Sequence, residues 1–267
     1  MKKLLKALAD CLFPALVYEG IAFFTGQCLW AILMGTGSLS KRGSIWIEEN
    51  SGLIVTGLAG VAAAGFFLIF EKERKNREEL KKKMLCKRSI AAMILLAVSS
   101  SVFFNAVLYV IPIPEIIVRP YQEAESKMFK GSIFLQAVVI CLAAPLGEEG
   151  AFRGCSFSRL REEHSFAIAA VLSSLSFAIY HGNVIQGIYT FCLGLLLCLT
   201  KEVYGTMKAP LLMHTTANGV SLLLACLPDS LNLSQIAMIR LTLFSGCLMI
   251  FFTIGIAARK RWPHFIS

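Results

Sequence analysis

Residues 193–199 read Leu-Gly-Leu-Leu-Leu-Cys-Leu, and the uncharged run 184–200 that contains them decides the fold class. Strands of a membrane β-barrel alternate apolar and polar residues, whereas this stretch is apolar throughout. A helix crosses the roughly 30 Å of bilayer hydrocarbon with about 20 apolar residues, or with slightly fewer where neighbouring helices cover its ends. The stretch therefore predicts a transmembrane helix and excludes a barrel.

Seven further apolar runs predict that the whole chain is built from such helices. The 267 residues are 56% hydrophobic and only 16% charged, and the apolar residues come in long uncharged stretches rather than as one soluble core. The eight runs are residues 11–34, 53–70, 89–111, 132–146, 166–181, 184–200, 210–227 and 241–258. We predict an all-α fold, a polytopic transmembrane helical bundle of about eight spans with both termini cytoplasmic. No linker or repeat divides the chain, so residues 1–267 form a single integral membrane domain.

The net charge of +9 is consistent with a nucleic-acid partner, and the placement of the basic residues tests that interpretation. With the N-terminus inside, twenty of the 26 lysines and arginines fall in inner segments, as the positive-inside rule requires. Nine of them lie in the segment 72–88, where glutamates are mixed with cations as in a solvated cytoplasmic loop. The basic charge is therefore topological, and it predicts membrane lipids, and no nucleic acid, as partners.

Two adjacent carboxylates end an apolar run in residues 145–154, which read Pro-Leu-Gly-Glu-Glu-Gly-Ala-Phe-Arg-Gly. Ionisable side chains at membrane depth are costly, so each is a candidate functional residue. On an α-helix Glu149 and Arg153 lie four apart and can pair, while Glu148 points about 100° away and stays free. A free carboxylate at the edge of the hydrocarbon suits a general base. The alternative is that both glutamates form an interfacial helix end facing the cytoplasm.

Two histidines follow on later spans, each with a partner one helical turn away. Phe177 and His181 share one helix face, and His214 and Asn218 share another. An imidazole beside a carboxylate can hold and polarise a water molecule, and a second imidazole with an amide can donate hydrogen bonds to an oxyanion. The alternative for each histidine is a hydrogen bond between helices.

A simple assignment of the spans places these residues at different depths. Glu148 falls near the inner face and His181 near the outer end of the fifth span, yet residues that share a water cannot differ much in depth. Either the fourth helix continues past Glu149, or the short fifth helix starts below the inner surface. The fifth apolar run is only ~24 Å long at about 1.5 Å per residue, which favours an active site in a cytoplasm-facing cavity.

Taken in order, Glu-Glu-x-x-x-Arg, Phe-x-x-x-His and His-x-x-x-Asn on successive spans resemble the CPBP family, which includes the CAAX prenyl endopeptidases and bacteriocin-processing or immunity proteins. The resemblance covers residues 132–227 as a CPBP-like catalytic core, and every motif position is filled. It implies an intramembrane endopeptidase of the bacterial cytoplasmic membrane. Its substrate would be a membrane-associated peptide or protein, prenylated or bacteriocin-like.

The resemblance also implies a role for each motif residue. Glu148, with His181, would activate water against a peptide carbonyl. His214 and Asn218 would stabilise the oxyanion, and Arg153 would orient the glutamate pair. Glu148, His181 and His214 could act either as ligands of a divalent metal such as zinc or as acid-base groups. We expect a glutamate-activated water without a tightly held metal.

Two other classes of function remain open. A non-catalytic immunity or binding protein would capture a bacteriocin, although such a protein has no need of Glu148 and both histidines together. A channel or transporter would need a polar pathway, and the outer halves of these spans show none. Glu19 in the first span has no predicted role beyond helix packing. The sequence assigns no oligomeric state.

Overall fold

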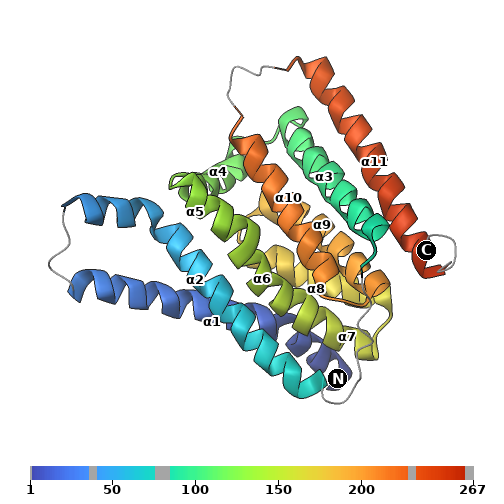
Figure 1. Ribbon diagram of the computed structural model, residues 1–267, viewed down its shortest axis with the longest axis horizontal. Coiled ribbons are helices and arrows are strands. Elements are labelled where there is room, and N and C mark those ends of the chain that lie inside the picture. Colours follow the sequence, from blue (N-terminus) through green and yellow to red (C-terminus); the bar gives the residue numbers. More distant parts are fainter. Residues whose placement is uncertain (1, 36–40, 76–84, 228–232, 262–267) are drawn as a thin grey trace.

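The computed structural model describes residues 2–35, 41–75, 85–227 and 233–261 of the chain, and every regular element in these ranges is a helix (Figure 1). In chain order the elements are α1 (Lys2–Gly35), α2 (Lys41–Lys75), α3 (Lys87–Val110), α4 (Glu115–Phe129), α5 (Ile133–Val138), η1 (Val139–Ala143), α6 (Ala144–Glu148), η2 (Glu149–Phe157), α7 (Ser158–Glu163), α8 (Phe166–Tyr180), α9 (Val184–Tyr204), α10 (Lys208–Ala225) and α11 (Gln235–Arg261). The predicted all-α class is confirmed.

Six helical stretches are long and apolar enough to cross a bilayer, namely Leu5–Met34, Ile45–Phe70, Lys87–Val110, Ile133–Glu163, Val184–Tyr204 and Gln235–Arg259. Helices also lie at the other two predicted runs, where α8 has 15 residues and α10 has 18. A bundle of apolar helices with this composition is an integral membrane protein. The count of eight spans and the cytoplasmic position of both termini stay predictions, and residues 76–84 of the predicted charged loop lie outside the described residues.

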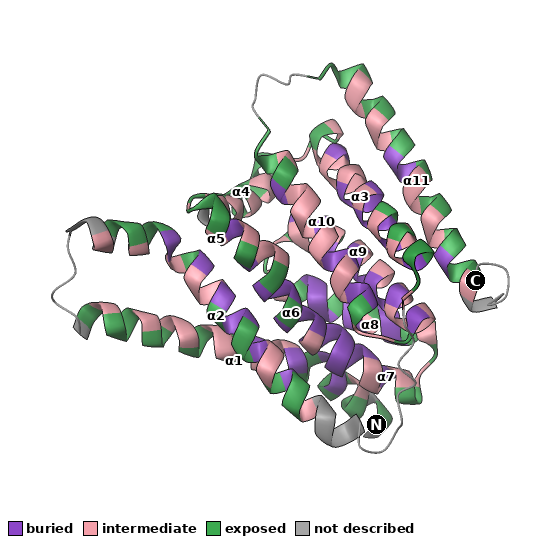
Figure 2. Cartoon of the chain, in the orientation of Figure 1, coloured by how far each residue is buried: buried purple, intermediate pink, exposed green. Residues whose placement is uncertain are grey.

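One long helical stretch carries the two glutamates and lies between two groups of helices. α1 and α2 pack against its α6 and η2 segments and extend away from the rest of the bundle as a pair (Figure 1). α8 and α10 contact it from the other group, in which α3 and α11 pack beside α9 and α10. Figure 2 shows buried residues concentrated around α6 and the turns that follow it, where the two groups meet.

This stretch, Ile133–Glu163, runs without a break through α5, η1, α6, η2 and α7. The segments η1 and η2 are π-helical, so their hydrogen bonds join residues five apart, a geometry that is rare and frequently found at functional sites. The helix therefore continues well past the apolar run 132–146. Of the two alternatives for the depth of the glutamates, the structure supports the longer fourth helix.

Two glycines allow the backbones of α2 and α6 to approach closely. A Cβ at Gly60 would lie 2.4 Å from the carbonyl oxygen of Ala143, and a Cβ at Gly147 would lie 2.6 Å from the carbonyl oxygen of Gly60. Small residues commonly permit such contacts between membrane helices. The contact holds the glutamate-bearing helix against the α1–α2 pair.

Gly60→Val is expected to lower the free energy of unfolding by about 1–3 kcal/mol, because the added side chain has no space between the two backbones. Gly65→Val, on the same helix, is the matched control, since a Cβ at Gly65 would meet no atom within 4 Å. Thermal unfolding of the detergent-solubilised variants measures both effects. Equal stability of the two variants would contradict the close contact.

Helices α3 and α10 lie side by side and run in the same direction. The Ser101 hydroxyl donates to the Ala217 carbonyl at 3.0 Å, and one turn further along both helices the Asn105 amide donates to the Ser221 hydroxyl at 3.2 Å. The first residues of both helices therefore lie at one end of the bundle. Their last residues lie at the opposite end.

This arrangement turns two native cysteines into topology markers, since Cys86 precedes α3 and Cys226 follows α10, and both are exposed. The positive-inside rule predicts that Cys86 faces the cytoplasm and Cys226 the outer side. In single-cysteine variants, a membrane-impermeant maleimide is expected to label Cys226 in intact cells and Cys86 only after permeabilisation. The reverse pattern would invert the predicted orientation.

Cys86 is also expected to react at unusually low pH. The Ser89 hydroxyl lies 3.0 Å from the sulfur, the Ser89 backbone adds a hydrogen bond, and the Arg259 guanidinium lies 3.7 Å away, so the pKa of the Cys86 thiol falls to about 6. Below that pH the thiol is protonated and slow, and above it the thiolate reacts fast. The alkylation rate of the single-Cys86 variant should rise with a midpoint near pH 6, and Arg259→Gln should move the midpoint upward. A midpoint unchanged by Arg259→Gln would contradict the role of the guanidinium.

Candidate active site

A buried polar group lies at the start of η2, where the second glutamate meets an arginine and a histidine. Arg153 Nη1 donates to Glu149 Oε1 at 3.1 Å, and His214 Nδ1 lies 2.8 Å from the same oxygen. Arg153 is 0% exposed and Glu149 1% exposed. The predicted Glu149–Arg153 pair is present, and burial of this kind excludes the alternative of a helix end facing the cytoplasm.

The Phe177 ring packs against this group of side chains. That contact explains why a phenylalanine precedes His181 by four residues in the Phe-x-x-x-His motif. The Arg153 guanidinium carbon lies 4.4 Å from the centroid of the Phe177 ring, a cation–π contact in a site without water access. The same ring meets the imidazoles of His181 and His214 edge to face, with centroids 4.7 and 5.8 Å apart. One aromatic side chain thus fixes the orientation of three functional groups.

Glu148 faces the opposite side of His214 from Glu149. Its Oε2 lies 3.5 Å from His214 Nε2, and 8% of the residue is exposed. Because the Glu149 carboxylate can only accept a hydrogen bond, His214 Nδ1 carries the proton of that pair and Nε2 is the nitrogen turned toward Glu148. Helix geometry predicted that Glu148 would be free of Arg153, and the structure adds that His214 stands between the two glutamates.

His181 and Asn218 hold their positions through backbone carbonyls. His181 Nδ1 lies 2.7 Å from the Phe177 carbonyl oxygen, so Nδ1–H donates and Nε2 is left as a hydrogen-bond acceptor. Asn218 Nδ2 donates to the Ile140 carbonyl in η1 at 2.8 Å, which uses one of its two N–H groups. Each side chain therefore keeps one polar group for a ligand.

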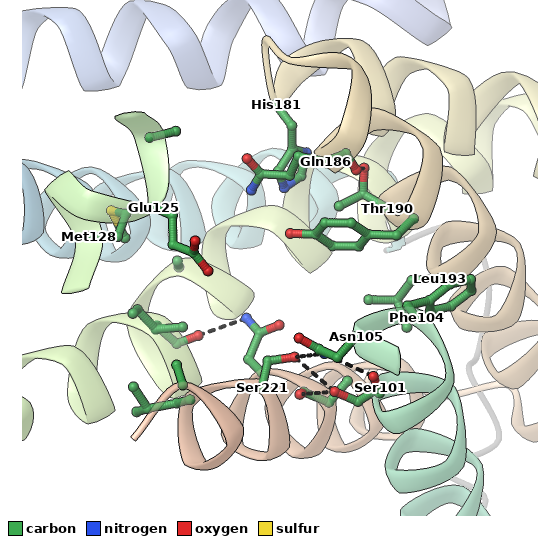
Figure 3. Close-up of a pocket in the computed structure, with 18 of the residues that line it drawn as sticks. Ser101, Phe104, Asn105, Glu125, Met128, His181, Gln186, Thr190, Leu193 and Ser221 are labelled. Atoms are coloured by element: carbon green, nitrogen blue, oxygen red, sulfur yellow. Dashed lines mark hydrogen bonds between the residues drawn. The ribbon is translucent and has the colours of Figure 1, made fainter. Parts of the chain in front are cut away.

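Four of the six predicted site residues meet at one cavity of about 500 Å³. Glu148, His181, His214 and Asn218 line it, whereas Glu149 and Arg153 lie behind the wall. The rest of the wall comes mainly from α3, α4, α9 and α10, and Figure 3 shows these side chains directed toward a common space.

The cavity lies toward the end of the bundle opposite the basic helix starts. Its lining from α3 begins only at Ser101 and its lining from α10 only at His214, away from Lys87 and Lys208. If the starts of α3 and α10 lie in the cytoplasm, as the positive-inside rule predicts, this end of the bundle is the outer one. The orientation of the bundle is a prediction, so the cytoplasm-facing cavity also stays a prediction.

Sequence reasoning missed most of the polar wall of this cavity, including a network between α3 and α10. The Ser101 and Ser221 hydroxyls lie 2.8 Å apart, and the Asn105 amide donates to the Ser101 carbonyl at 2.8 Å. Gln186 of α9 and Glu125 of α4 complete the polar wall. No polar pathway was expected along these spans, whereas polar side chains of α3 and α10 do line the cavity. Asn105 within the apolar run 89–111 was the signal, since amides at membrane depth seek partners.

The candidate metal ligands do not form a metal site in this arrangement. In the ranges that the structure describes, no three histidine, cysteine or carboxylate side chains come together in a group that could hold an ion. The Nδ1 atoms of His214 and His181 are engaged by Glu149 and by a carbonyl, so Nε2 is the nitrogen that each ring can offer to a ligand.

The fold and the site define a class of protein, an all-helical integral membrane protein with a carboxylate–imidazole site inside the bundle. Residues 130–220 match the sequence model of a family described as Rce1-like, type II CAAX prenyl endopeptidase Rce1-like. The match spans all three motifs, and it confirms the resemblance to the CPBP family. A match to this family model implies a protease. No curated protein and no solved structure matches the chain.

Proposed function

We propose that this chain is an intramembrane endopeptidase that hydrolyses a peptide bond of a membrane-associated substrate, prenylated or bacteriocin-like, in the bacterial cytoplasmic membrane. The observation that carries the proposal is the convergence of Glu148, His181, His214 and Asn218 on one cavity. Four polar side chains from three separate helices are costly to bring together inside a bundle of apolar helices unless they act on a common ligand.

In the proposed reaction a water molecule lies between Glu148 and His181. His181 Nε2 can only accept, because Nδ1–H already donates to the Phe177 carbonyl. The water then gives one hydrogen bond to Nε2 and the other to the Glu148 carboxylate, which leaves its lone pairs directed at the substrate. Glu148 is the general base and His181 positions and polarises the water.

The water oxygen attacks the carbonyl carbon of the scissile bond as Glu148 takes its proton. The carbonyl π electrons move to the oxygen, which becomes the oxyanion of a tetrahedral intermediate. When the intermediate collapses, the C–N bond breaks and the protonated Glu148 gives the proton to the leaving amine. The products are a carboxylic acid and an amine, and Glu148 returns to its starting state.

His214 and Asn218 stabilise the oxyanion from neighbouring turns of α10. Asn218 has one amide N–H left after donating to Ile140. His214 donates from Nε2 when both ring nitrogens carry protons, and Glu149, which accepts from Nδ1, supplies the compensating negative charge. Arg153 holds Glu149 in place, so it acts through the imidazole rather than on the substrate.

Asn218→Ala is expected to lower kcat roughly a hundred- to a thousandfold, the usual cost of removing one oxyanion donor. Asn105→Ala is the matched control, because Asn105 lines the same cavity but donates to α3 and to Ser221 rather than to η1. Turnover of a cleavable membrane-anchored peptide measures both variants. A loss as large for Asn105→Ala would mean that any polar change in the cavity disturbs activity.

The proposal is tested by incubating the purified chain in detergent with lipid-anchored peptides and identifying the new termini by mass spectrometry. We expect cleavage at one internal bond, and we expect a chelator to leave the rate unchanged. Loss of activity with the chelator and its return with zinc would replace the acid-base mechanism by a metal-assisted one. Stable binding of the peptides without any cleavage would overturn the endopeptidase function and leave a binding protein.

A further inference from the structure

The cavity wall contains two carboxylates that the proposed reaction does not use. Glu19 reaches it from α1 and Glu125 from α4, and together with Glu148 they make three acidic residues from three different helices. No lysine or arginine is among the described residues that line the cavity. The wall is therefore acidic, apart from the two histidines of the site.

Glu125 is the carboxylate best placed to meet a ligand. Figure 3 shows its carboxylate pointing into the cavity, and the Tyr121 hydroxyl donates to Oε1 at 3.1 Å. The structure describes no cation paired with it. Two residues earlier, Glu123 is 61% exposed and pairs with Arg119 on the outer face of the same helix. On α4, therefore, Glu123 faces away from the cavity and is paired with Arg119, whereas Glu125 faces the cavity.

The surroundings of Glu125 favour a cation on a long apolar stem. Phe104, Leu108 and Leu193 line the same cavity and supply apolar surface. Lysine and arginine bury their methylene stems along such surface while the charged head seeks an acceptor. A carboxylate in a partly enclosed cavity attracts a cation more strongly than one in open water, because the charges there are less screened.

We propose that Glu125 is a specificity-determining residue, and that the cavity selects a substrate peptide with a lysine or arginine side chain near the scissile bond. The selection rests on the proposed function, since it identifies the chemistry of the peptide that the endopeptidase takes. The basic side chain extends toward α4 and forms an ion pair with Glu125, while the scissile carbonyl lies beside Glu148. Glu19 adds a weaker, longer-range attraction.

The test is a binding measurement in which hydrolysis is blocked by Glu148→Gln. Probes are myristoylated hexapeptides of leucine and alanine that carry one lysine, one glutamine or one glutamate at each position in turn, in a non-ionic detergent. At one or more positions the lysine peptide is expected to bind about tenfold or more tightly than its glutamine counterpart. Adding Glu125→Gln should abolish that preference, and adding Glu123→Gln should retain it. High salt should weaken the preference.

A charge-reversed variant keeps the test decisive if Glu125→Gln folds poorly. Glu125→Lys is expected to bind the glutamate peptide more tightly than the lysine peptide, with a monodisperse profile in size-exclusion chromatography. Equal affinity for lysine and glutamine peptides at every position would overturn the inference. Failure of every lysine peptide to bind would also overturn it, as would a lysine preference that survives Glu125→Gln. All of these results are binding measurements that do not require turnover. A failed cleavage assay would therefore contradict the proposed function but would leave the charge preference untested by that assay and measurable by binding.

Discussion

Arg153→Met is expected to lower the free energy of unfolding by about 3–5 kcal/mol, because it leaves Glu149 as an uncompensated charge inside the bundle. Glu149 is 1% exposed, and its Oε1 is the oxygen that Arg153 contacts. Its other oxygen has no hydrogen-bond partner among the described residues. Thermal or denaturant unfolding in detergent measures the effect. A variant as stable as wild type would show that Glu149 does not depend on the guanidinium.

Arg153→Lys separates charge from shape at the same position. Lysine keeps the positive charge, but it has no flat guanidinium to lie over the Phe177 ring, where the Arg153 carbon is 4.4 Å from the centroid. We expect the folded state to survive and kcat to fall roughly 10- to 100-fold, as is typical when a group that orients a functional side chain is lost. Arg159→Lys is the control, since Arg159 is partly exposed and pairs with Asp10 at the edge of the bundle. Full activity of Arg153→Lys would mean that a point charge suffices.

The fold class could be predicted because the bilayer leaves a simple pattern in the sequence. Uncharged runs such as 184–200 had one physical interpretation, and a helix lies at each of the eight predicted places. The spans that remain undecided are the short ones, α8 and α10, whose lengths depend on how neighbouring helices cover their ends. Those neighbours are a property of the packing and not of the run itself.

The site was predictable at the level of residues and less so at the level of contacts. Spacing indicated the Glu149–Arg153 pair, and charge at membrane depth singled out both histidines. Spacing could not indicate that His214 lies between the two glutamates, because that contact joins η2 to α10 across 65 positions of sequence. The π-helical turns of η2 have no recognised sequence signal, and α-helical angles were assumed there.

The place of Glu125 in the cavity wall also could not be predicted from the sequence. It lies in the irregular, proline-containing segment between the third and fourth predicted spans, where charged residues are ordinary and carry no penalty of burial. The packing of α4 against α9, α2 and α5 brings it to the cavity. Glu19 was noticed as a charge in an apolar run, but its place in the wall depends on how α1 packs against the rest of the bundle.

The largest loss of activity is expected from Glu148→Gln. The amide keeps the volume and the hydrogen-bonding capacity of the carboxylate but cannot take a proton from water, so kcat should fall about a thousandfold or more with the fold intact. Glu163→Gln is the matched control, because Glu163 lies at the far end of the same long helix and pairs with Lys6 at the surface. Its activity should equal that of wild type.

Cleavage of a lipid-anchored peptide by purified Glu148→Gln protein is therefore the most direct measurement of the central claim that a carboxylate-activated water does the chemistry. We expect the variant to elute and unfold like wild type, to bind the peptide, and to release no new termini above the uncatalysed level. Turnover equal to wild type would contradict the mechanism, and the cavity would then have to be interpreted as a binding site.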